Sequence, residues 1–491
     1  MARIRGPIPF EDFRQRVRRH RTSDVLREVG RVSAELIKAG HSGVATGMPN
    51  VVQHFSLAAV ARAAVMYGNE HRSRTVGPND VAEMCAYYME VEDPALSLQP
   101  GAERLRGMLS RVLYEQAAFQ YSEMENIGRT VALLIDHADG CEGALSASDW
   151  RDLLGVTIEE FMRIGFAMHV AALQNGGRIG REVLKAPHVA PIFTPLSTDQ
   201  ALQVVDSLYA GTVAELRDRG QDAEVAGLEK WSFNPLLEKP IVAVGDELVM
   251  PVPRYVLDRF TPTGLYFVAL GKHGSRFTDA LGCMFERYVG TQLGQIASWV
   301  VHPELVYGSN GERTVDYFVV TKRCVLLVEV KAARPVEATR FGAADSDRDI
   351  EKKVGRALEQ INRSVGLLGV EPALAHINPS NLPVRGMVVT LEPFHLTNTP
   401  LYDEVLTSAD VPTVVVSAHE LEGFVAAVLP EPDADEYLEA AYVPTEDRLV
   451  PSLSAAVAEL AHGPNPILAA AWDRFMKPID DLVGVPDDRA T

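Results

Sequence analysis

Two apolar runs, at 315–320 and 324–331, constrain the fold of this chain most strongly. They read VDYFVV and CVLLVEVK and flank a basic Lys322 and Arg323 pair. Short runs rich in β-branched and aromatic residues are typical of buried strands, so the pattern predicts a β-hairpin. Asp316, Glu329 and Lys331 interrupt the runs. A charge on a buried strand is costly unless it is paired, hydrogen-bonded or metal-bound.

The predicted hairpin brings these three charges together. A symmetric turn between Lys322 and Arg323 places Asp316 opposite Glu329, where the Cα atoms of an antiparallel pair are about 4.5–5.5 Å apart. Side-chain alternation puts Lys331 on the same face as Glu329. Two facing carboxylates repel each other, so we expect them to share a proton or bind a cation. Their hard oxygens favour Mg²⁺ or Mn²⁺, and such an ion beside an ammonium group can activate water to hydrolyse a phosphodiester.

Further strands and helices are expected around the hairpin. The strand patterns lie near 299–307, 384–392 and 411–417, and the helical patterns at 275–297 and 345–369. Helices that flank apolar strands indicate an α/β layered domain. The sequence before residue 230 shows helical spacing, capping residues and glycine stops. Helices are expected there at 22–40, 50–68, 103–140 with a break near Gly128, 146–177 and 197–220.

The spacing of the two carboxylates and the lysine, together with the expected order of helices and strands, resembles the pattern of a known family. Asp316 is followed, 13 residues later, by the Glu-x-Lys of Glu329 and Lys331, which is similar to the motif of the PD-(D/E)xK nuclease superfamily. The resemblance covers about residues 277–417 and implies a restriction-endonuclease-like fold. It also implies that Asp316 and Glu329 ligate Mg²⁺ or Mn²⁺ and that Lys331 positions the attacking water. Val315 stands where the name-giving proline would be, a departure that many members of the family share.

Two helices carry further candidate residues. Glu286, in the helix before the strands, matches a glutamate that in the family often faces the metal through water; the alternative is a solvent-facing surface residue. Gly282 and Gly290 leave the helix edge beside it bare. A polar row on the second helix could contact phosphates, or could be an ordinary solvated face. Its members are Lys353, Arg356, Gln360 and Arg363.

The expected fold class is α plus α/β, a helical N-terminal region followed by a restriction-endonuclease-like domain with a mixed central sheet. The expected divisions are a helical region of unassigned role, with recognition as the candidate role, a mixed connecting module, the nuclease-like domain, and an acidic, proline-bearing exposed segment with a C-terminal helix. Their bounds are 1–229, 230–270, 271–430 and 431–491.

The expected function is metal-dependent hydrolysis of nucleic acid, with DNA favoured over RNA. By analogy with the family, a nuclease with a large helical half would suit restriction or defence against invading nucleic acid. A homodimer is compatible with the sequence. Two alternatives remain. Lys331 and a carboxylate form a buried structural ion pair, or the domain is an inactive nuclease-like scaffold that only binds nucleic acid or protein. A buried ion pair is seldom net stabilising, and here it would carry a surplus carboxylate, so we favour the enzyme.

Composition adds limits. The net charge is −19, which argues against a surface coated with nucleic acid but leaves room for a local basic groove. The sequence contains no run of eighteen apolar residues, so no membrane span is expected, and the N-terminus has no secretory pattern. The four cysteines are widely spaced, so we expect neither a disulfide framework nor a zinc site, Cys283 and Cys324 as ordinary core thiols, and a cytoplasmic location.

Overall fold

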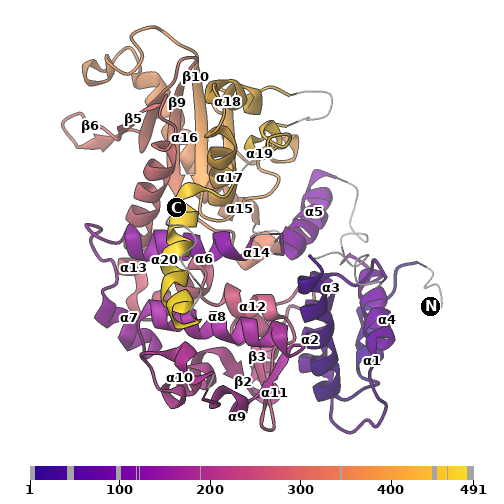
Figure 1. Cartoon of the computed structure of the whole chain (residues 1–491). Helices are drawn as coiled ribbons and strands as arrows, with labels where there is room; N and C mark the ends of the chain where they lie inside the picture. Colours follow the sequence, from indigo (N-terminus) through magenta and orange to yellow (C-terminus); the bar gives the residue numbers. More distant parts are fainter. Residues whose placement is uncertain are drawn as a thin grey trace.

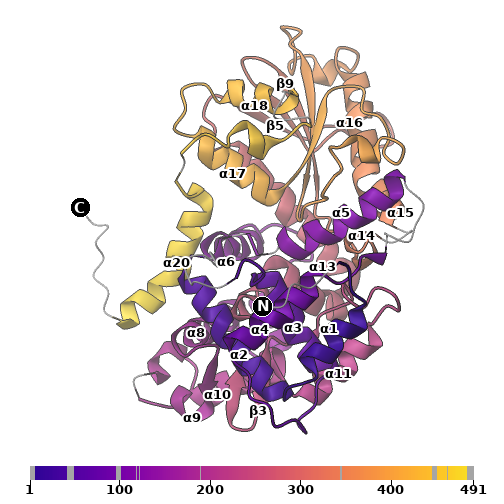
Figure 2. The same cartoon turned by 90° about the vertical axis from the view of Figure 1, so that its right-hand side faces the viewer.

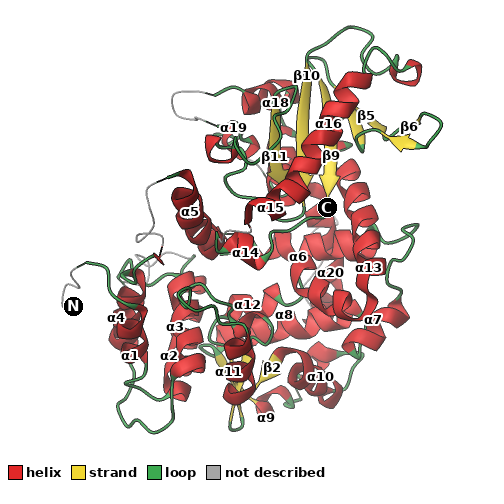
Figure 3. Ribbon diagram, turned by 180° about the vertical axis from the view of Figure 1, so that it is seen from behind, coloured by secondary structure: helices red, strands yellow, loops and turns green. Residues whose placement is uncertain are grey.

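The computed structural model describes residues 6–40, 49–94, 101–117, 119–120, 122–187, 189–342, 346–444, 450–461 and 463–483. It has a helix-rich part and a part built around a mixed sheet (Figures 1 and 3). Four helices begin the helix-rich part and share one apolar core. They are α1 (Phe10–Val17), α2 (Thr22–Lys38), α3 (His54–Tyr67) and α4 (Pro78–Met89).

The later helices of this part are more interrupted than the sequence predicts. The expected 103–140 helix is split into α5 (Ala102–Ala117) and α6 (Glu123–Val131), so the expected break near Gly128 is wrong. The 146–177 stretch divides into α7 (Ala147–Leu154) and α8 (Ile158–Gln174). Gly155 ends α7 with φ +75°, a left-handed conformation that favours glycine.

A small sheet corrects the prediction of an all-helical region. The expected 197–220 helix is α10 (Thr198–Val204), β2 (Ala210–Gly211) and α11 (Val213–Asp222). The sheet has the strand order β1-β4-β3-β2. Its other strands are β1 (Arg178–Gly180), β3 (Ile241–Val244) and β4 (Glu247–Val249). The 230–270 stretch therefore pairs with segments before it.

The second part contains a five-stranded sheet of order β11-β10-β9-β8-β5. β10 is parallel to both β9 and β11, whereas β8 is antiparallel to β9 and β5 to β8. The strands are β5 (Val300–Pro303), β8 (Tyr317–Val320), β9 (Val325–Lys331), β10 (Val384–Thr390) and β11 (Thr413–Ser417). The sheet is mixed, as predicted. A two-stranded ribbon, β6 (Val306–Tyr307) and β7 (Glu312–Arg313), lies between β5 and β8 in the chain.

Helices cover both faces of this sheet. Alternate residues of the strands join two different apolar cores, one shared with α13 (Pro262–Leu293) and α17 (Ala418–Val428), the other with α16 (Arg356–Leu367). Figure 2 shows α16 and α17 on opposite sides of the strands. A non-helical Gly274, with φ 55°, divides α13 by a kink. The expected domain start at 271 falls inside this element.

The acidic segment after residue 430 is folded over residues 431–444, the part that the structure describes, which corrects the prediction of an exposed connection. It forms α18 (Ala434–Tyr442), and Asp435 within it is 1% exposed. The Asp435 carboxylate accepts hydrogen bonds from the indole N–H of Trp299 and the backbone N–H of Lys322, each at 2.7 Å. A short α19 (Leu453–Ala456) and α20 (Pro466–Val483) follow.

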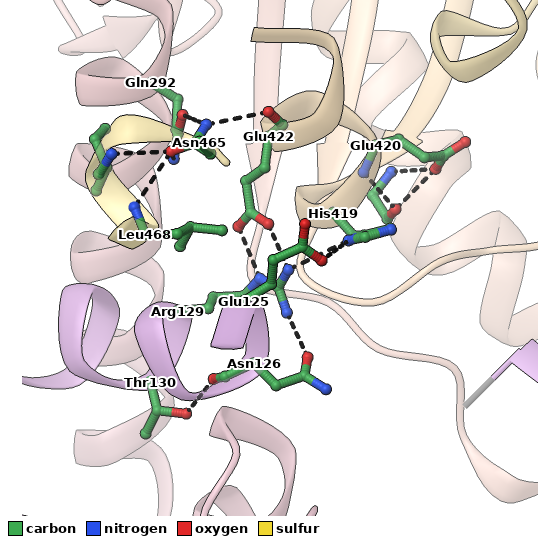
Figure 4. A network of polar contacts seen from close by, with 12 residues as sticks. Glu125, Asn126, Arg129, Thr130, Gln292, His419, Glu420, Glu422, Asn465 and Leu468 are labelled. Atoms are coloured by element: carbon green, nitrogen blue, oxygen red, sulfur yellow. Dashed lines mark hydrogen bonds and ion pairs between the residues drawn. The ribbon is translucent and has the colours of Figure 1, made fainter. Parts of the chain in front are cut away.

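A buried polar network joins the two parts (Figure 4). Arg129 of α6 donates from Nε to Glu422 of α17 at 2.7 Å. Asn465, just before α20, donates to the Glu422 carbonyl at 3.1 Å and to Gln292 of α13 at 2.8 Å. Residues from α6, α13, α17 and the segment before α20, which are distant in sequence, therefore meet around Glu422. Because these partners satisfy each other, we interpret the network as structural.

The cysteines differ from the prediction. Cys141 and Cys283 form a disulfide with a Cα–Cα distance of 5.8 Å, so the expectation that Cys283 is a core thiol is wrong. Cys85 and Cys324 are buried free thiols. The two bonded residues are 142 positions apart, and no spacing motif indicates such a pair. Among the described residues, no helix is long and apolar enough to cross a membrane.

Candidate active site

The central hairpin has the predicted register. Tyr317 lies opposite Val328, and Val320 opposite Val325. One further step along this register places Asp316, which immediately precedes β8, opposite Glu329. The Asp316 Oδ2 atom accepts a hydrogen bond from the backbone N–H of Val330 at 2.6 Å. The two carboxylates therefore lie at neighbouring positions of adjacent strands.

Glu329 is buried and only partly satisfied. Its side chain accepts a hydrogen bond from Lys331 Nζ through Oε1 at 2.5 Å. Its second oxygen, Oε2, is buried without a hydrogen-bond partner in the described structure, and the residue is 3% exposed. An unsatisfied buried carboxylate oxygen is strongly unfavourable, because desolvation is not compensated. The site therefore has an open position for a proton or a cation.

Burial and nearby negative charge raise the pKa of both carboxyl groups. Burial raises the pKa of Glu329 to about 8, and the facing Asp316 adds to the rise, whereas Lys331 opposes it. Burial also raises the pKa of Asp316, against the Val330 N–H and the Lys331 charge. The charged state of the pair is thus disfavoured unless a further cation compensates it.

Glu286 belongs to the same electrostatic environment. Burial raises its pKa to about 7, and the charges of Asp316 and Glu304 contribute to the rise. The tyrosine ring of Tyr317 packs against the bare helix edge, where a Cβ on Gly290 would come within 2.4 Å of the Tyr317 hydroxyl. That hydroxyl donates to the Glu286 carbonyl at 3.0 Å. The close approach of α13 to β8 holds Glu286 near Asp316. No atom lies within 4 Å of the place that a Cβ on Gly282 would take, so Gly282 does not contribute to the close approach of α13 to β8.

The polar row on the second helix is divided between different contacts. The Gln360 amide donates to the carbonyls of Arg313 and Thr314 at 2.7 and 2.8 Å, so it holds the chain just before Asp316. Arg363 donates to Gln360, and its charge lowers the pKa of Glu329.

The other two members of the row lie differently. Lys353 pairs with Asp349 at 2.6 Å and donates to the Arg334 carbonyl at 2.6 Å, beyond the end of β9. Arg356 is exposed. The row as a whole is therefore not a free phosphate-binding surface. Arg363 and Arg356 are the members that are exposed to solvent.

Two charged residues near the site were not predicted. Glu304 directly follows β5 and pairs with Arg313, the last residue of β7, at 2.7 Å. Both charges act on Asp316 and Glu286. Arg313 stands three residues before Asp316, and β5 is antiparallel to β8, so their position at this sheet end follows from the topology. The sequence has no motif for either residue.

The residues fit a hard divalent cation. Mg²⁺ is typically held by one or two protein carboxylates and keeps several waters. Asp316 and the unsatisfied Glu329 Oε2 offer such a pair. Across the described ranges, no group of three or more His, Cys, Asp or Glu side chains is arranged to hold a metal ion. Metal binding here would therefore rest on two protein ligands.

Comparisons of this chain with protein-family models, with curated proteins and with solved structures found no match. The functional argument accordingly rests on the residues and geometry of the site.

Proposed function

We propose that this protein is a divalent-metal-dependent nuclease that hydrolyses phosphodiester bonds of nucleic acid, with DNA favoured. One observation carries the proposal: Glu329 Oε2 is buried, without a hydrogen-bond partner in the described structure, next to a second carboxylate. The mixed sheet with helices on both faces supports it, because this arrangement agrees with the fold that the motif implies. The exposed Arg363, whose charge acts on Glu329, offers positive charge beside the site despite the net charge of −19.

The residues have distinct roles in this proposal. A bound Mg²⁺ or Mn²⁺ would supply Lewis-acid stabilisation of the phosphate and acidify a water molecule. Asp316 and Glu329 would hold it. Lys331 Nζ would orient the attacking water or the phosphate oxygen. Glu286, whose pKa is about 7, would accept the proton of that water, because a general base works best when its pKa is near the operating pH.

A second candidate function has its own supporting observation. Lys331 Nζ lies 2.5 Å from Glu329 Oε1, as in a structural ion pair. A domain that uses the pair for structure alone would be an inactive, nuclease-like scaffold. It would bind nucleic acid or protein without cutting. The same experiment separates the two functions.

The test is cutting of labelled single-stranded DNA, double-stranded DNA and RNA by the full chain with Mg²⁺, Mn²⁺ or EDTA. We expect cutting only with metal, and its loss in Glu329→Gln and Lys331→Met. The matched controls are Glu359→Gln and Lys352→Met, exposed residues of the same domain, which should cut like the wild type. Equal cutting by Lys331→Met would refute the mechanism. Binding without cutting under every metal would favour the scaffold.

A further inference from the structure

An exposed aromatic ring stands close to the candidate site. Phe267 of α13 is 61% exposed and is the one phenylalanine among the exposed large hydrophobic side chains of the described residues. Its ring faces the Arg334 guanidinium, whose central carbon lies 3.8 Å from the ring centroid. The same guanidinium lies 3.7 Å from the ring centroid of Tyr266. Two rings and one cation thus form a compact group, which we call the aromatic–arginine platform.

The fold places this platform at the same end of the sheet as the site. Arg334 follows Lys331, the last residue of β9, by three residues, which span at most about 10 Å. The Lys331 carbonyl accepts a hydrogen bond from Leu391 N at 3.2 Å, beyond the end of β10. Glu392 follows Leu391 in the chain, and its side chain accepts a hydrogen bond from Thr263, which lies one turn before Phe267 in α13. These contacts fix α13 against the strand ends.

The kink in α13 makes the arrangement possible. Gly274 adopts φ 55° and ψ −134°, outside the helical region, and a residue with a Cβ rarely adopts this conformation. The two halves of α13 then pack on each other, with the rings of Tyr266 and Phe277 6.0 Å apart. The first half brings Phe267 to the loop after β9, and the second half holds Glu286 beside Asp316. One helix therefore carries both features.

We propose that the aromatic–arginine platform stacks an unpaired base of a single-stranded nucleic acid whose phosphodiester lies at Glu329 and Lys331. The inference rests on the proposed nuclease function and adds a substrate class to it. Aromatic rings and arginine planes are the groups on which unpaired bases stack, without requiring a particular sequence. A base inside a duplex has no free face. The platform therefore selects single-stranded or locally opened substrates.

The chemistry of the platform favours a base over a protein partner. A protein interface buries a contiguous apolar patch, whereas Phe267 is one ring beside a cation. Arg340, which pairs with Glu392, adds a second guanidinium at the same strand ends. Positive charge next to an exposed ring suits a polyanion that carries flat, neutral bases.

The test compares binding of a short labelled single-stranded DNA with binding of the same strand lacking its bases, by fluorescence anisotropy. The full chain carries Glu329→Gln to prevent cutting. With Phe267 present, we expect the intact strand to bind about 5- to 150-fold tighter than the abasic strand, the range for stacking of one base. Phe267→Leu, which keeps an apolar side chain without a π-face, should remove most of this preference. Phe267→Tyr should retain it.

Val306→Ala is the matched control, because Val306 of β6 is equally exposed, at 61%. It should leave the preference unchanged. An identical preference in Phe267→Leu and the parent chain would overturn the platform, and so would equal binding of intact and abasic strands. If the wild type cuts duplex DNA or RNA under those results, the nuclease function stands without the platform. If the wild type neither binds nor cuts any nucleic acid, both proposals fail.

Discussion

Replacement of Glu329 by glutamine should stabilise the metal-free protein at alkaline pH. The folded-state pKa of Glu329 is about 8, compared with an ordinary value of 4.5. A carboxyl group with a raised pKa contributes stability that is fully present below pH 4.5 and is lost as pH rises through 8, because the folded state retains the proton that the unfolded state releases. The glutamine side chain of the variant keeps an oxygen that can accept the Lys331 hydrogen bond.

The magnitude follows from these two values. Each pKa unit is worth about 1.36 kcal/mol. The shift from 4.5 to about 8 therefore lowers the free energy of unfolding, relative to its value at low pH, by about 1 kcal/mol at pH 5 and about 4 kcal/mol at pH 8. The side chain of Glu329 is only 4% exposed, so solvent screens this effect little. Relaxation around the charge makes 4 kcal/mol an approximate upper limit, and about half of it is sufficient for the test.

The assay is urea unfolding in EDTA at pH 5, 6.5 and 8, with Glu359→Gln as an exposed control. We expect the advantage of Glu329→Gln to grow with pH and the control to follow the wild type. If the variant is instead less stable by several kcal/mol at every pH, Glu329 is a partner in a structural ion pair, and the reasoning is refuted.

Two further predictions use other charges. Saturating Mn²⁺ should raise the melting temperature of the wild type, because a ligand at a hundred times its Kd stabilises the folded state by about 2.7 kcal/mol. Asp316→Asn should lose most of this increase. An equal shift in both proteins would place the metal elsewhere. Arg129→Met should lower the free energy of unfolding by about 3–5 kcal/mol, because it leaves the buried Glu422 carboxylate without its arginine partner. Arg474→Met, which breaks the more exposed pair with Asp136, should change it by less than about 1 kcal/mol, and equal losses would refute the structural role of the network.

The hairpin register was predictable because its information is local. Two apolar runs of similar length flank one turn, and a slip of one residue would move every side chain to the opposite face. The pairing of Tyr317 with Val328 therefore follows from the sequence. The position of Glu286 does not follow from the local sequence. It depends on how closely α13 approaches β8, which Gly290 permits but does not require.

Features that join distant segments were not predictable. β1 pairs with β4 although the paired residues are 67 to 71 positions apart in the sequence, and each strand alone is too short to show alternation. Asp435 lies in an acidic, proline-bearing stretch, and its burial depends on Trp299 and the backbone of Lys322. The Cys141–Cys283 bond likewise depends on the packing of α13 against the helical segment Ala132–Asp136, which continues α6 and is followed by the loop that carries Cys141. These partners become neighbours only in the folded chain.

Binding of Mn²⁺ to the full chain, followed by electron paramagnetic resonance without nucleic acid, tests the central claim most directly. It asks whether Asp316 and Glu329 hold a metal ion, and it does not depend on the choice of substrate. We predict saturable binding by the wild type and by Glu359→Gln. Asp316→Asn and Glu329→Gln should each bind at least about tenfold more weakly, as expected when a metal site is disturbed. Equal affinity of all four proteins for Mn²⁺ would contradict the account.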